Sequence, residues 1–250
     1  MADAQYGKAF FDEITEASLR AARLIVPHLM ELVGPSSVVD LGCGRGTWLK
    51  AFEEAGVNTL QGFDGGVINK EDFCVNPEFF TSFDLRQPLN SDLKADLALS
   101  METAEHLPPE RGESFVADLV KIAPAVYFSA AVPRQGGVGH INEQPQSYWA
   151  KMFAKHGYLP VGEIRKRIWD DLNAGAVYAQ NGLLYISPEL ASARPDLQQL
   201  IEQTSHEILD IVHPAIHQGK NSYYSPQEAG IAQLVKSIPY AIKATIARRK

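Results

Sequence analysis

The residues that could bind a ligand or catalyse a reaction follow short apolar runs directly in the sequence. The first group is Asp-Leu-Gly-Cys-Gly-Arg-Gly at 40–46, in which glycines alternate with other residues behind the acid Asp40. Glycine adopts backbone angles that other residues avoid, and it lets a ligand approach the main chain closely. A helix that begins right after such a turn also offers free N–H groups. The segment therefore predicts a turn that binds a cofactor through its backbone.

The spacing of the glycines separates this turn from two common nucleotide sites. A dinucleotide fingerprint is G-x-G-x-x-G, whereas the spacing here is G-x-G-x-G, and the Gly-Lys-Ser/Thr of a P-loop is missing. For Cys43, between two glycines, we expect a backbone contact and not a nucleophilic thiolate. The cofactor residues predicted in this turn are Asp40, Gly42, Cys43, Gly44 and Gly46.

Two further acids fit the same ligand. Asp64 ends the next apolar run, and a carboxylate at that place can accept hydrogen bonds from both hydroxyls of a ribose. Taken alone, Asp64 could equally be a turn residue before two glycines. Asp84, in Phe-Asp-Leu at 83–85, is the second acid, and the pair favours ligand binding for both.

Two histidines lie in polar stretches behind later apolar runs. His106 belongs to Glu-Thr-Ala-Glu-His-Leu at 102–107, and His140 follows a glycine-rich loop. The pKa of imidazole is near neutrality, so a histidine can take the proton of a hydroxyl group. The predicted catalytic residues are His140, His106 and Glu102. The alternatives are a hydrogen bond within the loop for His140 and a capping role for His106.

The polar residues around His140 predict contacts with an acceptor molecule, because substrate groups usually lie on loops that a rigid sheet holds. The predicted acceptor-binding residues are Gln135, Asn142, Glu143, Gln144 and Trp149. Glu143 could instead assist His140 or form a peripheral salt bridge.

These residues need elements that position them. Apolar runs at 37–41, 59–63, 97–100, 125–130, 158–162 and 182–187 alternate with helical patterns at 47–54, 109–122 and 146–155. This alternation is typical of a doubly wound parallel sheet, which binds ligands beyond the carboxyl ends of its strands. We expect an N-terminal helical cap at 1–34 with a helix over 14–33, a sheet domain at 35–188 and a helical extension at 189–250.

With this strand–turn–helix context, the segment 40–46 resembles the first motif of class I S-adenosylmethionine-dependent methyltransferases. Phe-Asp-Leu at 83–85 resembles their third motif, and 100–108 resembles the fourth motif of enzymes that act on small molecules. The resemblance implies a Rossmann-like, seven-stranded, mostly parallel sheet with an antiparallel last strand, and S-adenosylmethionine as cofactor. It also implies that Asp84 accepts from the adenine amino group, that Leu85 lies along the ring, and that Ser100 is near the cofactor. Glu102 would orient the acceptor or the methionine amino group.

The stretch 10–187 is similar to bacterial methyltransferases of sugar and secondary-metabolite pathways. The similar pieces are Phe-Phe-Asp-Glu at 10–13, the segments 102–107 and 139–144, Arg-Ile-Trp-Asp at 167–170 and Gln-Asn at 180–181. The resemblance implies methyl transfer to a hydroxyl of a sugar or natural-product intermediate. Asn-Ala-Gly-Ala-Val at 173–177 stands where that family carries aromatic residues, so the acceptor contacts there stay open.

Composition narrows the remaining possibilities. The net charge is −7, with 30 acidic and 23 basic residues, and no Asp/Asn-Pro-Pro-Tyr motif follows the fourth run, which disfavours nucleic acid as a partner. We expect a cytoplasmic protein, since no signal peptide and no apolar run of about 20 residues is present. The basic segment 231–250 fits a solvated helix or one that faces a membrane or partner.

Three alternative functions stay open, and no bound metal is expected. An N-methyltransferase of a small amine would need no strong base, and a non-catalytic S-adenosylmethionine-binding module would need no acceptor residues. A nucleic-acid methyltransferase is the third alternative. No metal is expected, because no dense acidic cluster is visible and the pair His213 and His217 lacks the glutamate of a helical zinc motif. The oligomeric state stays open.

Overall fold

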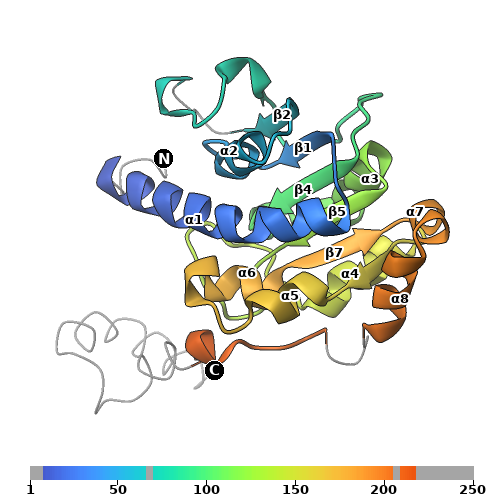
Figure 1. Ribbon diagram of the computed structural model, residues 1–250. Coiled ribbons are helices and arrows are strands. Elements are labelled where there is room, and N and C mark those ends of the chain that lie inside the picture. The colour runs from blue at the N-terminus through green and yellow to red at the C-terminus, as the bar shows by residue number, and fades with distance from the viewer. Residues whose placement is uncertain (1–7, 66–69, 205–208, 218–250) are drawn as a thin grey trace, which may run out of the picture. The chain divides into compact units, whose positions relative to one another are not determined.

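The computed structural model describes residues 8–65, 70–204 and 209–217 (Figure 1). The chain divides into two compact units, the first ending at Ile211 and the second beginning at Val212. Every helix and strand named below belongs to the first unit. Among the described residues, no helix is both long enough and apolar enough to span a membrane.

Seven strands form one sheet in the order β3-β2-β1-β4-β5-β7-β6. The strands are β1 (Ser37–Leu41), β2 (Thr59–Asp64), β3 (Phe80–Ser82), β4 (Leu97–Met101), β5 (Ala125–Ser129), β6 (Leu159–Val161) and β7 (Leu183–Ile186). Only β7 runs antiparallel to its neighbours, β5 and β6. The predicted doubly wound, mostly parallel sheet with an antiparallel last strand is confirmed.

Helices cover both faces of the sheet, which explains why its central strands are apolar along their whole length. One face carries α1 (Lys8–Leu32), α2 (Thr47–Glu54), α5 (Glu163–Ile168), α6 (Ala176–Asn181) and α8 (Pro195–Gln203), and the other carries α3 (Gly112–Ile122) and α4 (Gln146–Ala154) (Figure 1). Each face has its own core, one around Leu29 and Phe52 and the other around Phe115 and Phe153.

The register of the first two strands prepares the site. Asp40 of β1 stands opposite Gly62 of β2, and Leu41 stands opposite Phe63. The two strands therefore end side by side, and the turn after β1 meets the acid that ends β2. A side chain on Gly62 would collide with the Cys43 sulfur, since its Cβ would lie 2.7 Å from Sγ. The glycine lets the turn lie directly on β2.

Several elements differ from the expectation. α1 begins at Lys8 and continues through Pro27, and α3 begins at Gly112 because 109–111 forms a short 3-10 turn behind Pro108. β3, α5 and α6 have no counterpart among the predicted elements. They hold three, six and six residues, which is too short for apolar periodicity to reveal.

The helices that follow β7 belong to the first unit. After α7 (Pro188–Ala193), α8 buries Leu197 and Ile201 in the core, and Thr204 Oγ1 accepts a hydrogen bond of 3.1 Å from the Gly162 amide. The boundaries proposed at 34/35 and 188/189 stay predictions. The basic segment 231–250 lies outside the described residues.

Candidate active site

The glycine turn joins β1 to α2, as the sequence predicted. Gly42, Gly44 and Gly46 have φ angles of 93°, 51° and 74°, which side-chain-bearing residues rarely adopt. At Gly42 space matters as well as conformation, because a Cβ there would lie 2.1 Å from Thr103 Oγ1. The backbone after β1 thus lies directly against the segment after β4.

Hydrogen bonds fix this turn to the end of β2. The amides of Gly42 and Cys43 donate to the Phe63 carbonyl at 2.8 and 3.2 Å, and the Gly44 amide donates to Asp64 Oδ2 at 2.9 Å. The Cys43 side chain is buried in the core. Burial raises the pKa of its thiol, so the cysteine contributes backbone and volume here and no thiolate.

Asp40 has a buried carboxyl group with no hydrogen-bond partner among the described residues. It is 1% exposed, and neither of its oxygens accepts a hydrogen bond from any residue that the structure describes. Burial, and then the charge of Asp64, raise the pKa of Asp40 to about 7. Buried polar groups are normally hydrogen-bonded, so an unpaired carboxyl beside a glycine turn points to a ligand that completes it.

A cavity of about 490 Å³ opens beyond the carboxyl ends of β1, β2 and β4. Six of the predicted residues line it, namely Gly42, Asp64, Asp84, Leu85, Glu102 and His106. The residues that line it without having been predicted are Gly65, Arg86, Thr103 and Leu107. The structure thus brings the two acids of the expected cofactor site and two of the three expected catalytic residues to one cavity.

The loop that carries Asp84 and Leu85 is tied to α3 by a buried ion pair. Arg111 pairs with Asp118, and its guanidinium also donates to the carbonyl of Leu85 at 3.0 Å. Both carboxylate oxygens of Asp84 accept hydrogen bonds of 2.8 Å from Arg86, which holds the pKa of Asp84 below its usual value. Asp84 is therefore an ionised, already paired group at the cavity wall.

Glu102 follows β4 in a strained backbone conformation. Its φ of 50° is unusual for a residue with a side chain, and such strain persists where the surroundings enforce it. Asn181 Nδ2 donates to its Oε1 at 3.0 Å, and Gln135 Nε2 donates to its Oε2 at 2.8 Å. Burial raises the pKa of Glu102 although these hydrogen bonds oppose the shift. Asn181 was part of a similar segment in the sequence but had no predicted role.

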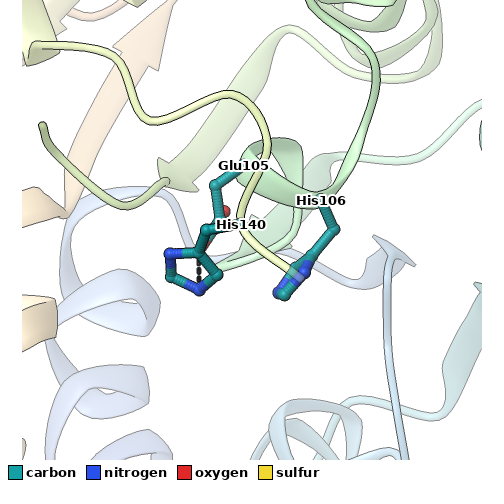
Figure 2. A group of neighbouring side chains, drawn as sticks. All are labelled: Glu105, His106 and His140. Carbon is teal, nitrogen blue, oxygen red and sulfur yellow. Dashed lines mark ion pairs between the residues drawn. The ribbon is translucent and has the colours of Figure 1, made fainter. Parts of the chain in front are cut away.

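Glu105, His106 and His140 point toward one another beside the cavity (Figure 2). Glu105 and His106 come from the short turn after β4, and His140 comes from the loop after β5. His140 Nε2 lies 4.0 Å from Glu105 Oε1, and the two imidazole rings meet edge to face at 4.8 Å between centroids. Although the side chain of His106 is exposed at its surface, desolvation by the surrounding protein, followed by the nearby His140, lowers the pKa of His106.

Glu143 holds His140 from the other side. Its Oε1 lies 3.1 Å from His140 Nδ1 and accepts from the Gly136 amide, while its Oε2 accepts from the Arg134 amide at 2.7 Å. Burial would raise the pKa of Glu143, but the hydrogen bonds from His140 and the two amides outweigh it and lower the pKa. Of the alternatives for Glu143, the structure has the contact with His140.

The other predicted residues do not line the cavity. Ser100 and Trp149 face the core: Ser100 is buried on β4, and Trp149 is 2% exposed and packs on Phe128. Asn142 is buried, and Gln144 Nε2 donates to its Oδ1 at 3.0 Å. The inward face of α4 explains the position of Trp149, which the short polar sequence around it did not reveal.

Glu105 is the residue that sequence reasoning overlooked. It is fully buried, neither oxygen of its carboxyl accepts a hydrogen bond from the described residues, and its pKa is raised to about 8 by burial and by Glu102. The sequence pattern that could have revealed it is Glu-x-x-Glu-His directly after a buried strand. Sequence reasoning gave a role only to the first glutamate of this pattern and to the histidine.

Comparison with known proteins finds one family match. A family model described as a methyltransferase domain matches residues 9–115, which is less than half of the chain and includes the glycine turn, Asp64 and Glu102. No curated protein matches the sequence.

Several solved structures resemble the chain. Magnesium protoporphyrin IX methyltransferase from Synechocystis PCC 6803, with bound SAH, is 16% identical over 63% of this chain and 80% of its own, with a TM-score of 0.45. A TehB-like SAM-dependent methyltransferase from Corynebacterium glutamicum is 20% identical over 67% and 87%, with a TM-score of 0.46. An O-methyltransferase family protein from Burkholderia thailandensis is 14% identical over 70% and 58%, with a TM-score of 0.49.

The family match to a methyltransferase domain covers the part of the chain that forms the glycine turn and the acid at the end of β2.

Proposed function

We propose that the chain is a class I S-adenosylmethionine-dependent methyltransferase that methylates a hydroxyl group of a small molecule, such as a sugar or a natural-product intermediate. One observation carries the proposal: a single cavity is lined by Gly42 and Asp64 on one side and by Glu102 and His106 on the other. A volume of about 490 Å³ is in the range of small-molecule sites, and the net charge of −7 disfavours a polyanionic acceptor.

The cofactor half of the cavity follows from the acids and the turn. Asp64 would accept hydrogen bonds from the ribose hydroxyls while it holds the Gly44 amide. Leu85 would lie along the adenine ring, with Asp84 at its amino group. The unpaired carboxyl of Asp40 would gain a partner when the turn is occupied, and the glycines of the turn let the cofactor approach the main chain.

The residues on the acceptor side of the cavity would take the proton from the acceptor hydroxyl group. When bound, S-adenosylmethionine supplies a methyl group, which forms a bond to the acceptor oxygen as the bond to sulfur breaks and its electron pair stays on sulfur. Because the Nδ1 of His140 faces Glu143, its Nε2 bears the lone pair that can take the hydroxyl proton. The ionised carboxylate of Glu143 then stabilises the imidazolium. Glu102, fixed by Asn181 and Gln135, would orient the acceptor.

The ribose assignment is tested by calorimetry with S-adenosylhomocysteine. We expect Asp64→Asn to bind it about 10- to 100-fold more weakly than the wild type, since hydrogen bonds to a charged carboxylate are lost. Asp92→Asn, which changes an exposed aspartate away from the cavity, is the control and keeps wild-type affinity. Equal affinities for Asp64→Asn and the wild type would remove Asp64 from the site.

The acceptor class is tested with a labelled methyl group and panels of nucleotide sugars and small amines. We expect label on a hydroxyl acceptor and a loss of about 100-fold or more in kcat for His140→Ala. Transfer to amines with near-normal turnover in that variant would identify an N-methyltransferase. Cofactor binding without transfer to any extract would identify a non-catalytic module.

A further inference from the structure

The three side chains of Glu105, His106 and His140 form a cluster that methyl transfer alone does not require (Figure 2). We propose that this cluster binds one divalent first-row transition-metal ion at the acceptor side of the cavity. Two imidazoles and one carboxylate are a common ligand set for such ions, whereas magnesium and calcium favour oxygen ligands.

The geometry is close to that of a coordinated ion. One ligand atom from each residue lies within 4.8 Å of the others, and His140 Nε2 is 4.0 Å from Glu105 Oε1. Ligand atoms at about 2.1 Å from a metal lie roughly 3 Å from one another. An ion therefore needs the side chains to close by about 1–2 Å. His140 follows Gly137 and Gly139, which gives its loop the conformational freedom to do so.

The carboxyl group of Glu105 is an independent sign of a ligand. It is 0% exposed and accepts no hydrogen bond from any residue in the described part of the chain. The backbone around it is fixed, because the Glu105 carbonyl accepts from the amides of Ile141 and Asn142 at 2.9 and 3.0 Å. A buried carboxylate is stable when it is paired or binds a metal, and the ring nitrogens of both histidines lie close to the carboxyl group of Glu105.

The outer contacts of both histidines are those of metal ligands. His106 Nδ1 lies 3.3 Å from the Gly139 carbonyl, and His140 Nδ1 lies 3.1 Å from Glu143 Oε1. A histidine that binds metal usually donates its other ring N–H to a carbonyl or carboxylate, which fixes the tautomer and orients the ring. Here both rings are held in this way, so each keeps the lone pair of Nε2 for an ion.

Three protein ligands leave coordination positions open, and His106 lines the cavity in which the acceptor would lie. This step rests on the proposed function. A hydroxyl group bound to the ion loses its proton more readily, as metal-bound water does, and the proton passes to solvent water. The oxygen then forms its bond to the methyl carbon while the sulfur keeps the electron pair. Nε2 cannot hold a proton and a metal together. His140 therefore takes the hydroxyl proton only while the ion is absent, and in the metal-loaded chain it is a ligand.

Binding of Co²⁺ tests the site without cofactor or acceptor. The full chain is freed of metal with EDTA, dialysed and titrated with Co²⁺ while the visible absorption of the ion and the heat of binding are recorded. We expect one ion per wild-type chain, and a loss of affinity of about 100-fold or more in Glu105→Gln and His106→Gln. His217→Gln, which changes an exposed histidine of the pair at 213 and 217, is the matched control and binds as the wild type does.

Three outcomes would overturn the proposal: no bound ion in the wild type, unchanged affinity in Glu105→Gln and His106→Gln, or loss of binding in His217→Gln. His106 is exposed, so its variant folds even if the buried Glu105→Gln does not. Binding of S-adenosylhomocysteine by each variant reports folding and cofactor binding separately. A chain that binds Co²⁺ but methylates no hydroxyl contradicts the proposed function and leaves the metal site standing.

Discussion

Two buried carboxyl groups belong to residues next to the wall of the cavity: Asp40 lies just before Gly42 in the sequence, and Glu105 lies just before His106. Both lack a hydrogen-bond partner among the described residues, and burial raises their pKa values to about 7 and about 8. Folding alone gains nothing from such groups, because an unpaired carboxylate in the interior is costly. Asp40 precedes the glycine turn, and Glu105 lies beside the two histidines. These positions fit a cofactor at the turn and a cation at the histidines.

The cost of burying the ionised carboxylate of Asp40 predicts that the stability of the fold depends on pH. Below pH about 4 both the folded and the unfolded chain hold the proton, since an ordinary aspartate has a pKa of 3.8. Between about 4 and 7 only the folded chain holds it, so the free energy of unfolding falls as the pH rises, and the loss is complete above about 7. We expect this group to contribute a loss of about 4 kcal/mol.

Urea unfolding of the wild type and of Asp40→Asn from pH 4 to 8 measures that contribution. The difference in unfolding free energy between the two proteins should shift in favour of the variant as the pH rises. Asp92→Asn, at an exposed position, should leave the profile unchanged. A constant difference between wild type and Asp40→Asn across this range would show that the carboxyl titrates normally.

At the scale of elements, the cavity depends on how the segments after β1, β2 and β4 meet. The turn after β1 is fixed to β2 through Phe63 and Asp64, and Gly42 touches Thr103 behind β4. The loop after β3 is held by Arg111, which donates to the Leu85 carbonyl and pairs with Asp118. Each contact joins residues that are far apart in the sequence.

Gly42 and Gly44 offer a matched pair of variants within one turn. Both have positive φ, so alanine costs about 1–2 kcal/mol of backbone strain at either position. A Cβ on Gly44 meets open space, whereas one on Gly42 collides with Thr103. We expect Gly42→Ala to lose about 1–3 kcal/mol more than Gly44→Ala. Thermal or urea unfolding measures the difference, and equal losses would mean that Thr103 yields without cost.

At the scale of the molecule, the first unit has a core on each face of its sheet. α8 belongs to the core that α1 and α2 cover, through Leu197 and Ile201. Thr204, just behind α8, accepts from the Gly162 amide next to β6. The unit therefore continues beyond β7, and its last described residues reach Ile211.

This packing predicts where the chain tolerates truncation. We expect a chain of residues 1–211 to unfold cooperatively and to bind S-adenosylhomocysteine. A chain of residues 1–188 loses the burial of Leu197 and Ile201, about 3–6 kcal/mol, and uncovers the core beneath them. Circular dichroism melts and calorimetry on both chains provide the comparison. Equal stability of the two would support a domain boundary at residue 188.

Local sequence patterns were enough for the elements that begin the sheet. The bounds 37–41 and 47–54 were predicted as β1 and α2 appear, because an apolar run, alternating glycines and an amphipathic helix are readable within 18 residues. Asp64 was found for the same reason, since it ends a run of strand-forming residues. Short elements such as β3 were missed because three residues carry no period.

The sequence by itself determined the sheet and the glycine turn, because both depend on neighbours along the chain. Only the tertiary structure decided which polar residues share the cavity. It placed Trp149 in the core. It also left Glu105 buried without a hydrogen-bond partner among the described residues, facing His140, which comes from a loop 35 positions later. The packing of β4 beside β5 brings these loops together, and no local pattern in either loop encodes that contact.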